Sequence, residues 1–547
     1  MATNAEIEAS YTKKRIQAVA TEIGLDPDSV LPHGHYIGKV PIGELEARSE
    51  DPDGSLILVT AMTPTPAGEG KTTTSIGLAD AIRSAGRKTA LCLREPSLGP
   101  YFGIKGGGTG AGHAQIVPAE DINLHFVGDM DSVSKANNLL SALLDNHLQF
   151  GNELGVDPRR ITWKRVIDLN DRALREIFVG LGGVTHGIPR KDGFNITPAS
   201  EVMAVLCLAM NYRDLRDRLG RIVVGYTRKR TEITAEMLLA EGGMTVLLRD
   251  AISPNMVQTL GGTPTFVHGG PFANIAHGCN SVVATRLALK LADRVVTEAG
   301  FASDLGAEKF FDIKCRIAGL KPSAVVIVAT ERAIEHHGGF SEDAGTGNLL
   351  KHIENMRVFG LEPVVAVNRF SGDTADGLRK ILDFCQKHGV RAAAYEGYAK
   401  GGEGAAALAN LVEDSIAVNE KADSFKFLYP DSASIREKIE TVAHVIYGAD
   451  GVDFDSPAEK SIELIEKHGS SKVPVCMAKT QNSLSDNGKL FGRPKGFRIR
   501  VNEVVLSAGA GFVVVTCGKM MTMPGLPKEP VAVRIKVDDA GHATGLS

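Results

Sequence analysis

The sequence predicts an α/β fold in which a mostly parallel sheet is flanked by helices. Short, continuously aliphatic runs lie at residues 56–59, 324–329 and 363–367, and segments with helical periodicity separate them. Such runs are typical of parallel strands that helices cover on both faces. The alternation of strands and helices favours a large parallel sheet. Near the C-terminus the sequence becomes polar and rich in turn residues, which indicates smaller α/β domains.

A glycine-rich turn, TPAGEGKTTT at residues 65–74, joins the first of these strands to a helix. Gly68 and Gly70 tolerate positive φ and carry no side chain, so backbone N–H groups there could wrap a polyphosphate. Lys71 would reach the β- and γ-phosphates, and the Thr72 hydroxyl would be a ligand of Mg²⁺. The loop lacks the glycine that usually begins this pattern. It predicts a P-loop NTPase-like domain; the alternative is a glycine-rich turn with a surface lysine.

Arg94 ends the next expected strand, residues 88–96, which we place parallel to residues 56–59 and beside them. In an open α/β sheet the carboxyl ends of the strands face the ligand crevice. A guanidinium there offers two parallel charge-assisted bonds to a phosphoryl or acyl phosphate group. The alternative is a structural ion pair with Glu95.

Three further segments are candidates for structure or binding. Residues 103–113 form a second glycine-rich loop, either a lid or floor for ligands or a plain connector. Residues 120–129 alternate apolar and polar side chains as a strand does. In the segment 267–278, His268 and Gly269 precede an expected helix, so imidazoles and backbone amides could converge on a substrate; alternatively the histidines are structural.

Phe370 and Tyr398 each follow an expected strand and could clamp a flat heterocycle between them, or they could simply cap the core. The net charge of −4 argues against nucleic-acid binding. Seven scattered cysteines fit a reducing compartment, and the sequence lacks both a signal-type leader and an apolar run of membrane-spanning length. We therefore expect a cytoplasmic protein that binds neither nucleic acid nor membrane.

Five segments together resemble the formate–tetrahydrofolate ligase family. They are TPAGEGKTTT at 65–74, REPSLGP at 94–100, EDINLHF at 120–126, FVHGGPFANIAHGCNS at 266–281 and MTMPGLP at 521–527. The likeness covers essentially the whole chain, and the segment 266–281 is very specific.

The resemblance implies ATP-dependent ligation of formate to tetrahydrofolate through formyl phosphate, giving 10-formyltetrahydrofolate, ADP and phosphate. Lys71 and Arg94 would be catalytic, with Arg94 holding formate, while Phe370 and Tyr398 would stack the pterin or adenine ring. A homotetramer and a monovalent cation, K⁺ or NH₄⁺, are also implied. The residues that would hold ATP, and Mg²⁺ through it, are Thr65, Pro66, Ala67, Gly68, Glu69, Gly70, Lys71 and Thr72.

We expect three units on this basis: 1–320 to bind nucleotide and activate formate, 321–425 to carry the stacking aromatics, and 426–547 to form a C-terminal α/β domain.

The chain departs from the family pattern at a few positions. The second glycine loop loses a tyrosine within residues 109–113, Glu331 and Glu335 add negative charge, and Tyr398 replaces tryptophan. These departures keep one alternative open, a catalytically weakened paralogue that binds nucleotide or folate in a regulatory or structural role. The glycine-rich turn at 65–74 alone would also fit a different carboxylate-activating enzyme, such as a dethiobiotin-synthetase-like ligase, which the chain length and the segment 266–281 disfavour.

Overall fold

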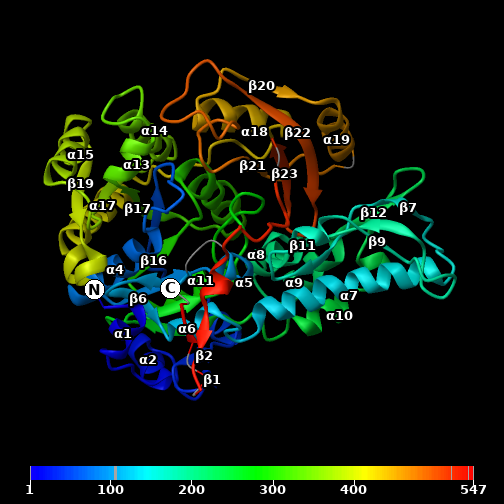
Figure 1. Cartoon of the computed structure of the whole chain (residues 1–547), viewed down its shortest axis with the longest axis horizontal. Coiled ribbons are helices and arrows are strands. Elements are labelled where there is room, and N and C mark those ends of the chain that lie inside the picture. Colours follow the sequence, from blue (N-terminus) through cyan, green and yellow to red (C-terminus); the bar gives the residue numbers. More distant parts are fainter. Residues whose placement is uncertain are drawn as a thin grey trace.

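A twelve-stranded, mostly parallel sheet runs through the centre of the computed structural model (Figure 1). The structure describes residues 2–103, 107–467, 469–518, 520–539, 541 and 543–545. The main path of the sheet follows the order β1 (Leu31–His33), β2 (Ile37–Lys39), β14 (Asn255–Thr259), β15 (Pro264–Val267), β4 (Thr89–Leu93), β16 (Arg294–Glu298), β3 (Ser55–Ala61), β17 (Pro322–Ala329), β18 (Val364–Asn368) and β19 (Arg391–Tyr395).

All neighbours from β15 to β19 along this path are parallel, as the sequence predicts. Alternate side chains of β3 enter two separate cores, because successive residues of a strand point to opposite faces. Ile57 and Val59 pack with α4 (Lys71–Ser84) and α17 (Ala406–Ala422). Leu56 and Leu58 share their core with α11 (Val282–Leu291), α14 (Gly345–Val358) and α15 (Ala375–Lys387). The sheet is thus covered on both faces.

Two local expectations are wrong. β4 is parallel to β3 but does not lie beside it, because β16 inserts between them and pairs with both. Residues 120–129 are not a strand: Ala119–Asn123 form the short helix α6, which buries Ile122 completely against the core of α4. In each case a contact with a distant segment decides the arrangement, and the local pattern does not report that contact.

The C-terminal part has a four-stranded sheet of its own, in the order β20 (Gly451–Phe454), β22 (Arg498–Ser507), β23 (Phe512–Cys517) and β21 (Val475–Ala478). It lies at the top right of Figure 1 with the helices α18 (Ile435–Thr441) and α19 (Ser456–Lys467). A domain boundary after residue 320 would pass through the central sheet, because β16 and β17 both pair with β3. The three-unit division otherwise stays a prediction.

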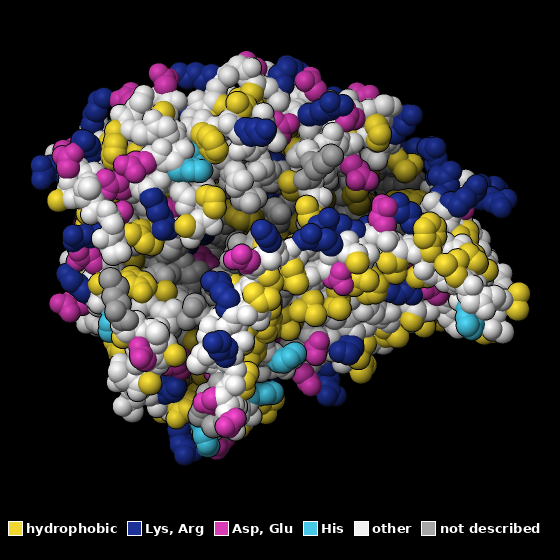
Figure 2. Space-filling view, in the orientation of Figure 1, with side chains coloured by type: hydrophobic (Ala, Val, Ile, Leu, Met, Phe, Trp, Pro, Cys, Tyr) yellow, Lys and Arg dark blue, Asp and Glu magenta, His cyan; other side chains and the backbone are white. Residues whose placement is uncertain are grey.

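An elongated arm extends to the right in Figure 1. It contains α7 (Asp129–Gln149), α10 (Glu241–Leu247), β7 (Val156–Ile161), β9 (Ile177–Val179) and β12 (Val223–Thr227). Figure 2 shows hydrophobic side chains gathered along this arm. Large apolar side chains that are at least 70% exposed in this part of the chain are Phe150, Phe178, Leu181, Val184, Leu239 and Val246. None of the helices in the described part of the chain combines the length and the apolar character needed to span a bilayer.

Candidate active site

The candidate site lies at the carboxyl edge of the parallel strands. Residues that follow β3, β4, β16, β17, β18 and β19 meet there because these strands all run in the same direction. The predicted residues Lys71, Arg94, Phe370 and Tyr398 each come after one of these strands. Ligands of open α/β sheets bind along this edge.

The glycine-rich turn at residues 65–74, which we call the phosphate loop, has the backbone that its sequence requires. Gly68 and Gly70 have φ of +78° and +76°, in the left-handed region, and Gly70 caps the start of α4. A Cβ on Gly70 would clash with the side-chain amide of Asn368, the last residue of β18. Lys71 and Thr72 form the first turn of α4. The loop therefore presents no side chain at Gly68 or Gly70, which suits a polyphosphate bound by backbone N–H groups at a helix start.

Glu69 shapes this loop from inside. Its carboxylate is 2% exposed and accepts hydrogen bonds from the Thr65 amide at 2.7 Å and from the Thr330 hydroxyl. The Asn368 amide donates to the Glu69 carbonyl at 2.9 Å. The carboxylate is thus occupied within the protein, and Glu69 offers a nucleotide its backbone only. Pro66 and Ala67 form the exposed tip of the loop.

The sequence analysis missed Glu298, the last residue of β16. Its Oε2 accepts a hydrogen bond from the Thr72 hydroxyl at 2.9 Å, and the residue is 6% exposed. A hydroxyl at the start of the phosphate-loop helix and a carboxylate at the end of a neighbouring strand are the protein groups that hold Mg²⁺ in P-loop enzymes. The pair fits a nucleotide-bound Mg²⁺, whose remaining ligands would be phosphate oxygens and water.

Arg94 lies at the end of β4 with much of its hydrogen-bonding capacity unused. Its Nη1 donates to the Pro271 carbonyl at 3.3 Å, and its buried Nε has no hydrogen-bond partner among the described residues. A Cβ added at Gly300 would meet both Nη atoms, at 3.1 and 3.3 Å. The guanidinium is therefore held between two backbone segments and can still donate to a small anion. An ion pair with Glu95 is absent from the described residues, contrary to the structural alternative.

Glu95 points instead into a buried polar cluster. The residue is 4% exposed, and its Oε2 has no hydrogen-bond partner in the described chain. Burial and, next, the nearby Asp129 carboxylate hold the pKa of Glu95 well above its ordinary value, although Lys39 opposes this. Lys39 itself forms an ion pair with Asp129 at 3.0 Å. A cation bound next to Glu95 would stabilise the ionised form of this carboxyl group.

His268 and Gly269 lie inside the scaffold. His268 is fully buried; its Nδ1 lies 2.6 Å from the Ser281 hydroxyl and its Nε2 lies 2.6 Å from the Ala251 carbonyl. Burial lowers its pKa to about 4, so the ring is neutral. The Gly269 carbonyl accepts from the Glu95 amide at 2.9 Å. Both ring nitrogens of His268 are thus engaged within the protein, and substrate binding by His268 and Gly269 stays a prediction.

Phe370 and Tyr398 follow the neighbouring strands β18 and β19. The Arg369 amide donates to the Tyr395 carbonyl at 3.0 Å, which holds the two loops side by side. The Phe370 ring lies next to Gly70 of the phosphate loop, 3.8 Å from where a Cβ would stand. Tyr398 is 44% exposed, and ring stacking between it and Phe370 is absent from the described residues. Tyr398 therefore covers neither face of Phe370.

The departures from the family pattern have local structural roles. Residues 104–106 of the second glycine loop lie outside the described residues. The Thr109 hydroxyl accepts from the Asn123 amide at 2.9 Å. The His113 amide donates to the Tyr398 carbonyl at 2.9 Å, so the second glycine loop directly contacts the segment that carries Tyr398. Glu335 is exposed.

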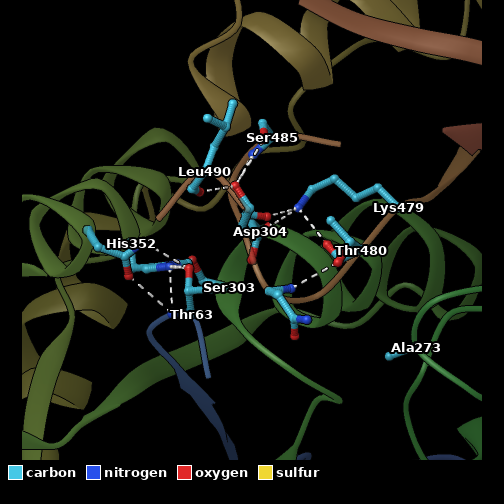
Figure 3. A network of polar contacts seen from close by, with 12 residues as sticks. Thr63, Ala273, Ser303, Asp304, His352, Lys479, Thr480, Ser485 and Leu490 are labelled. Atoms are coloured by element: carbon cyan, nitrogen blue, oxygen red, sulfur yellow. Dashed lines mark hydrogen bonds and ion pairs between the residues drawn. The ribbon is translucent and has the colours of Figure 1, made fainter. Parts of the chain in front are cut away.

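A buried polar network holds Thr63, just before the phosphate loop (Figure 3). His352 of α14 accepts from the Thr63 amide at 2.9 Å through Nε2, and its Nδ1 lies 2.6 Å from the Ser303 hydroxyl. Asp304 forms an ion pair at 2.7 Å with Lys479 of the C-terminal part. Thr63 is two residues before Thr65, so these contacts fix the strand end from which the loop departs.

Comparison with known proteins shows the family of the chain. A family model described as formate–tetrahydrofolate ligase matches residues 2–547. A protein of that name from Paracoccus denitrificans (strain Pd 1222) is 54% identical over 557 residues, covering 100% of both chains. Another from Granulibacter bethesdensis (strain ATCC BAA-1260 / CGDNIH1) is 53% identical over 556 residues, covering 100% of this chain and 97% of its own. The chain belongs to the formate–tetrahydrofolate ligase family.

Proposed function

We propose that the protein catalyses the ATP-dependent ligation of formate to tetrahydrofolate, giving 10-formyltetrahydrofolate, ADP and phosphate. The observation that carries the proposal is the meeting of three groups at one sheet edge: the phosphate loop with Lys71, the Thr72–Glu298 pair, and the under-used guanidinium of Arg94. Membership of the ligase family supports the same activity. The fold of the phosphate site is, in this proposal, P-loop NTPase-like.

The first step activates formate by phosphoryl transfer. A formate oxygen attacks the γ-phosphorus of ATP, the bond from that phosphorus to the β,γ-bridging oxygen breaks, and ADP leaves with the bond electrons. Lys71 and the amides of the phosphate loop neutralise and orient the phosphates, while Arg94 holds formate and then formyl phosphate. Phosphoryl transfer depends mainly on such positioning and charge stabilisation.

The second step transfers the formyl group. N10 of tetrahydrofolate attacks the formyl carbon, inorganic phosphate leaves, and the nitrogen loses its proton. Phe370 and Tyr398 would stack the pterin or adenine ring, because they follow adjacent strands at the edge where Arg94 lies. Aromatic stacking of this kind contributes about 0.5–1.5 kcal/mol beyond area burial.

Two ions belong to the proposal. Thr72 and Glu298 would hold Mg²⁺, which when bound neutralises charge on the transferring phosphates. A monovalent cation, K⁺ or NH₄⁺, would be held near Glu95, whose buried carboxylate has an oxygen without a partner among the described residues. Glu95 follows Arg94 in the sequence, so this cation would add positive charge close to the formate site.

We also propose a cytoplasmic homotetramer. All seven cysteines are buried and unpaired, which suits a reducing compartment. The exposed apolar side chains of the arm, among them Phe178 and Val184 at 71% and 89% exposure, support burial of this surface between subunits.

The test is the substrate requirement of the purified protein. We expect 10-formyltetrahydrofolate and ADP in equal amounts only when Mg-ATP, formate and tetrahydrofolate are all present, with loss of product in Lys71→Ala and Arg94→Ala. Nucleotide or folate binding without formyl product in the unsubstituted protein would overturn the proposal and leave the weakened paralogue.

A further inference from the structure

Three consecutive residues at the carboxyl end of β17 contact two different parts of the proposed site. Thr330 caps the helix α13 (Glu331–His336), and its hydroxyl also donates to the Glu69 carboxylate of the phosphate loop. Glu331 and Arg332 contact the loop that carries Phe370. We call residues 330–332 the linking turn.

Arg332 contacts the phosphate loop and, at the same time, residues 370–374, which we call the aromatic loop. Its Nη2 donates to the Gly68 carbonyl, and its Nε lies 3.7 Å from Oε2 of Glu69. The guanidinium carbon lies over the Phe370 ring, 3.6 Å from the ring centroid. A planar guanidinium suits both contacts, because it can stack on an aromatic face while its edge donates hydrogen bonds.

Glu331 fixes the far end of the same aromatic loop. It is 7% exposed, and its two carboxylate oxygens accept from the Thr374 amide and the Thr374 hydroxyl, each at 2.7 Å. Thr374 is the N-cap of α15. Inside the loop, the Phe370 amide donates to Asp373 at 2.8 Å. The chain from Phe370 to Thr374 is therefore held by Arg332 at one end and by Glu331 at the other.

We propose that the linking turn couples nucleotide binding to folate binding, and that Arg332 is the positioning residue that transmits the coupling. This inference rests on the proposed function. Phosphates favour the loop arrangement in which the Gly68 carbonyl points away from them, and Arg332 bonds that carbonyl. A ligand ring stacked on the face of Phe370 opposite Arg332 would favour the ring position over which Arg332 lies. Both ligands select the same position of one side chain, so each strengthens the binding of the other.

The coupling is measured most cleanly with a phosphate probe that has no ring. Mg-tripolyphosphate would occupy the phosphate loop and cannot stack on Phe370, so it separates transmitted coupling from a shared contact. Isothermal titration calorimetry would give the dissociation constant of tetrahydrofolate with and without saturating Mg-tripolyphosphate. We expect the probe to tighten tetrahydrofolate binding to the unsubstituted protein by about fivefold or more, the lower end of typical coupling between sites.

Two variants test whether Arg332 and Glu331 transmit the coupling. Arg332→Lys keeps the positive charge but loses the planar stack and the fork, and we expect less than twofold coupling. Glu331→Gln keeps the shape but loses the charge at the Thr374 cap; we expect partial loss of coupling, and this variant serves if Arg332→Lys fails to fold. Arg357→Lys is the matched control, because Arg357 lies at the end of α14, pairs with Glu362 and contacts neither loop; this variant should retain the full coupling.

The possible results distinguish failure of the coupling from failure of the proposed function. Independent binding of the two probes to the unsubstituted protein, or unreduced coupling in a folded Arg332→Lys protein, would overturn this inference alone. An unsubstituted protein that binds neither probe would overturn the proposed function and this inference with it. A merely structural role for Arg332 would weaken both ligands but leave their coupling intact, which also contradicts the proposal.

Discussion

The Glu298→Gln substitution tests the Mg²⁺ assignment most sharply. Glutamine keeps the size of the side chain and can still accept a hydrogen bond from the Thr72 hydroxyl, which lies 2.9 Å from the carboxylate in the native protein. It removes only the negative charge. Because the residue is 6% exposed, little solvent is present to compensate for that loss.

The expected effect on catalysis is large and the effect on stability small. A hydrogen bond or contact that involves a charged group contributes about 1.5–3 kcal/mol. At 1.36 kcal/mol per factor of ten, this corresponds to a decrease of about 10- to 150-fold in kcat/KM for Mg-ATP. The free energy of unfolding should change by only about 1 kcal/mol, since the Thr72 bond persists and a buried charge is removed.

Initial rates of formyl product formation over a titration of Mg²⁺ would measure the effect, with urea unfolding as the stability check. Glu413→Gln is a matched control, because Glu413 bonds Arg294 at the opposite, amino end of β16. We expect this control to keep the native Mg²⁺ dependence. A Glu298→Gln protein with the native rate and the native Mg²⁺ dependence would refute the assignment.

Three further outcomes are expected. Tyr398→Trp should lower the KM for tetrahydrofolate about two- to fivefold, because a larger ring stacks more strongly; an unchanged KM in steady-state assays would count against stacking there. Activation by potassium should strengthen as the pH rises, since burial and Asp129 raise the pKa of Glu95 and only its ionised form attracts a cation. Rates at several pH values test this, and Glu95→Gln should abolish the activation. Burial lowers the pKa of His352 to about 4, below its value near 6.5 in the unfolded chain. The unfolded state therefore binds more protons between these values, and urea unfolding should show stability falling from pH 6.5 to 4, less steeply in His352→Gln.

Local sequence patterns predicted the phosphate loop well. The loop is built from consecutive residues, so the strand before it, the two positive-φ glycines and the helix that begins at Lys71 could all be predicted from adjacent positions. Arg94, Phe370 and Tyr398 were placed correctly at the carboxyl ends of strands, because strands and helices alternate regularly in this fold.

Contacts between distant segments could not be predicted in this way. Glu298 meets Thr72 only because β16 inserts between β4 and β3, and the strand order of a sheet does not follow from any one strand. His268 belongs to a very specific motif, yet the structure encloses its ring between Ser281 and Ala251. A motif identifies the family, and it does not separate residues that bind ligands from residues that hold the scaffold.

The measurement that tests the central claim most directly follows the oxygen atoms of formate. If formate attacks the γ-phosphorus of ATP at the phosphate loop, one of its oxygens becomes part of the phosphate that leaves formyl phosphate. With formate labelled by heavy oxygen, mass spectrometry should find one labelled oxygen in each inorganic phosphate released with the formyl product. Unlabelled phosphate accompanying 10-formyltetrahydrofolate would contradict activation of formate by phosphoryl transfer.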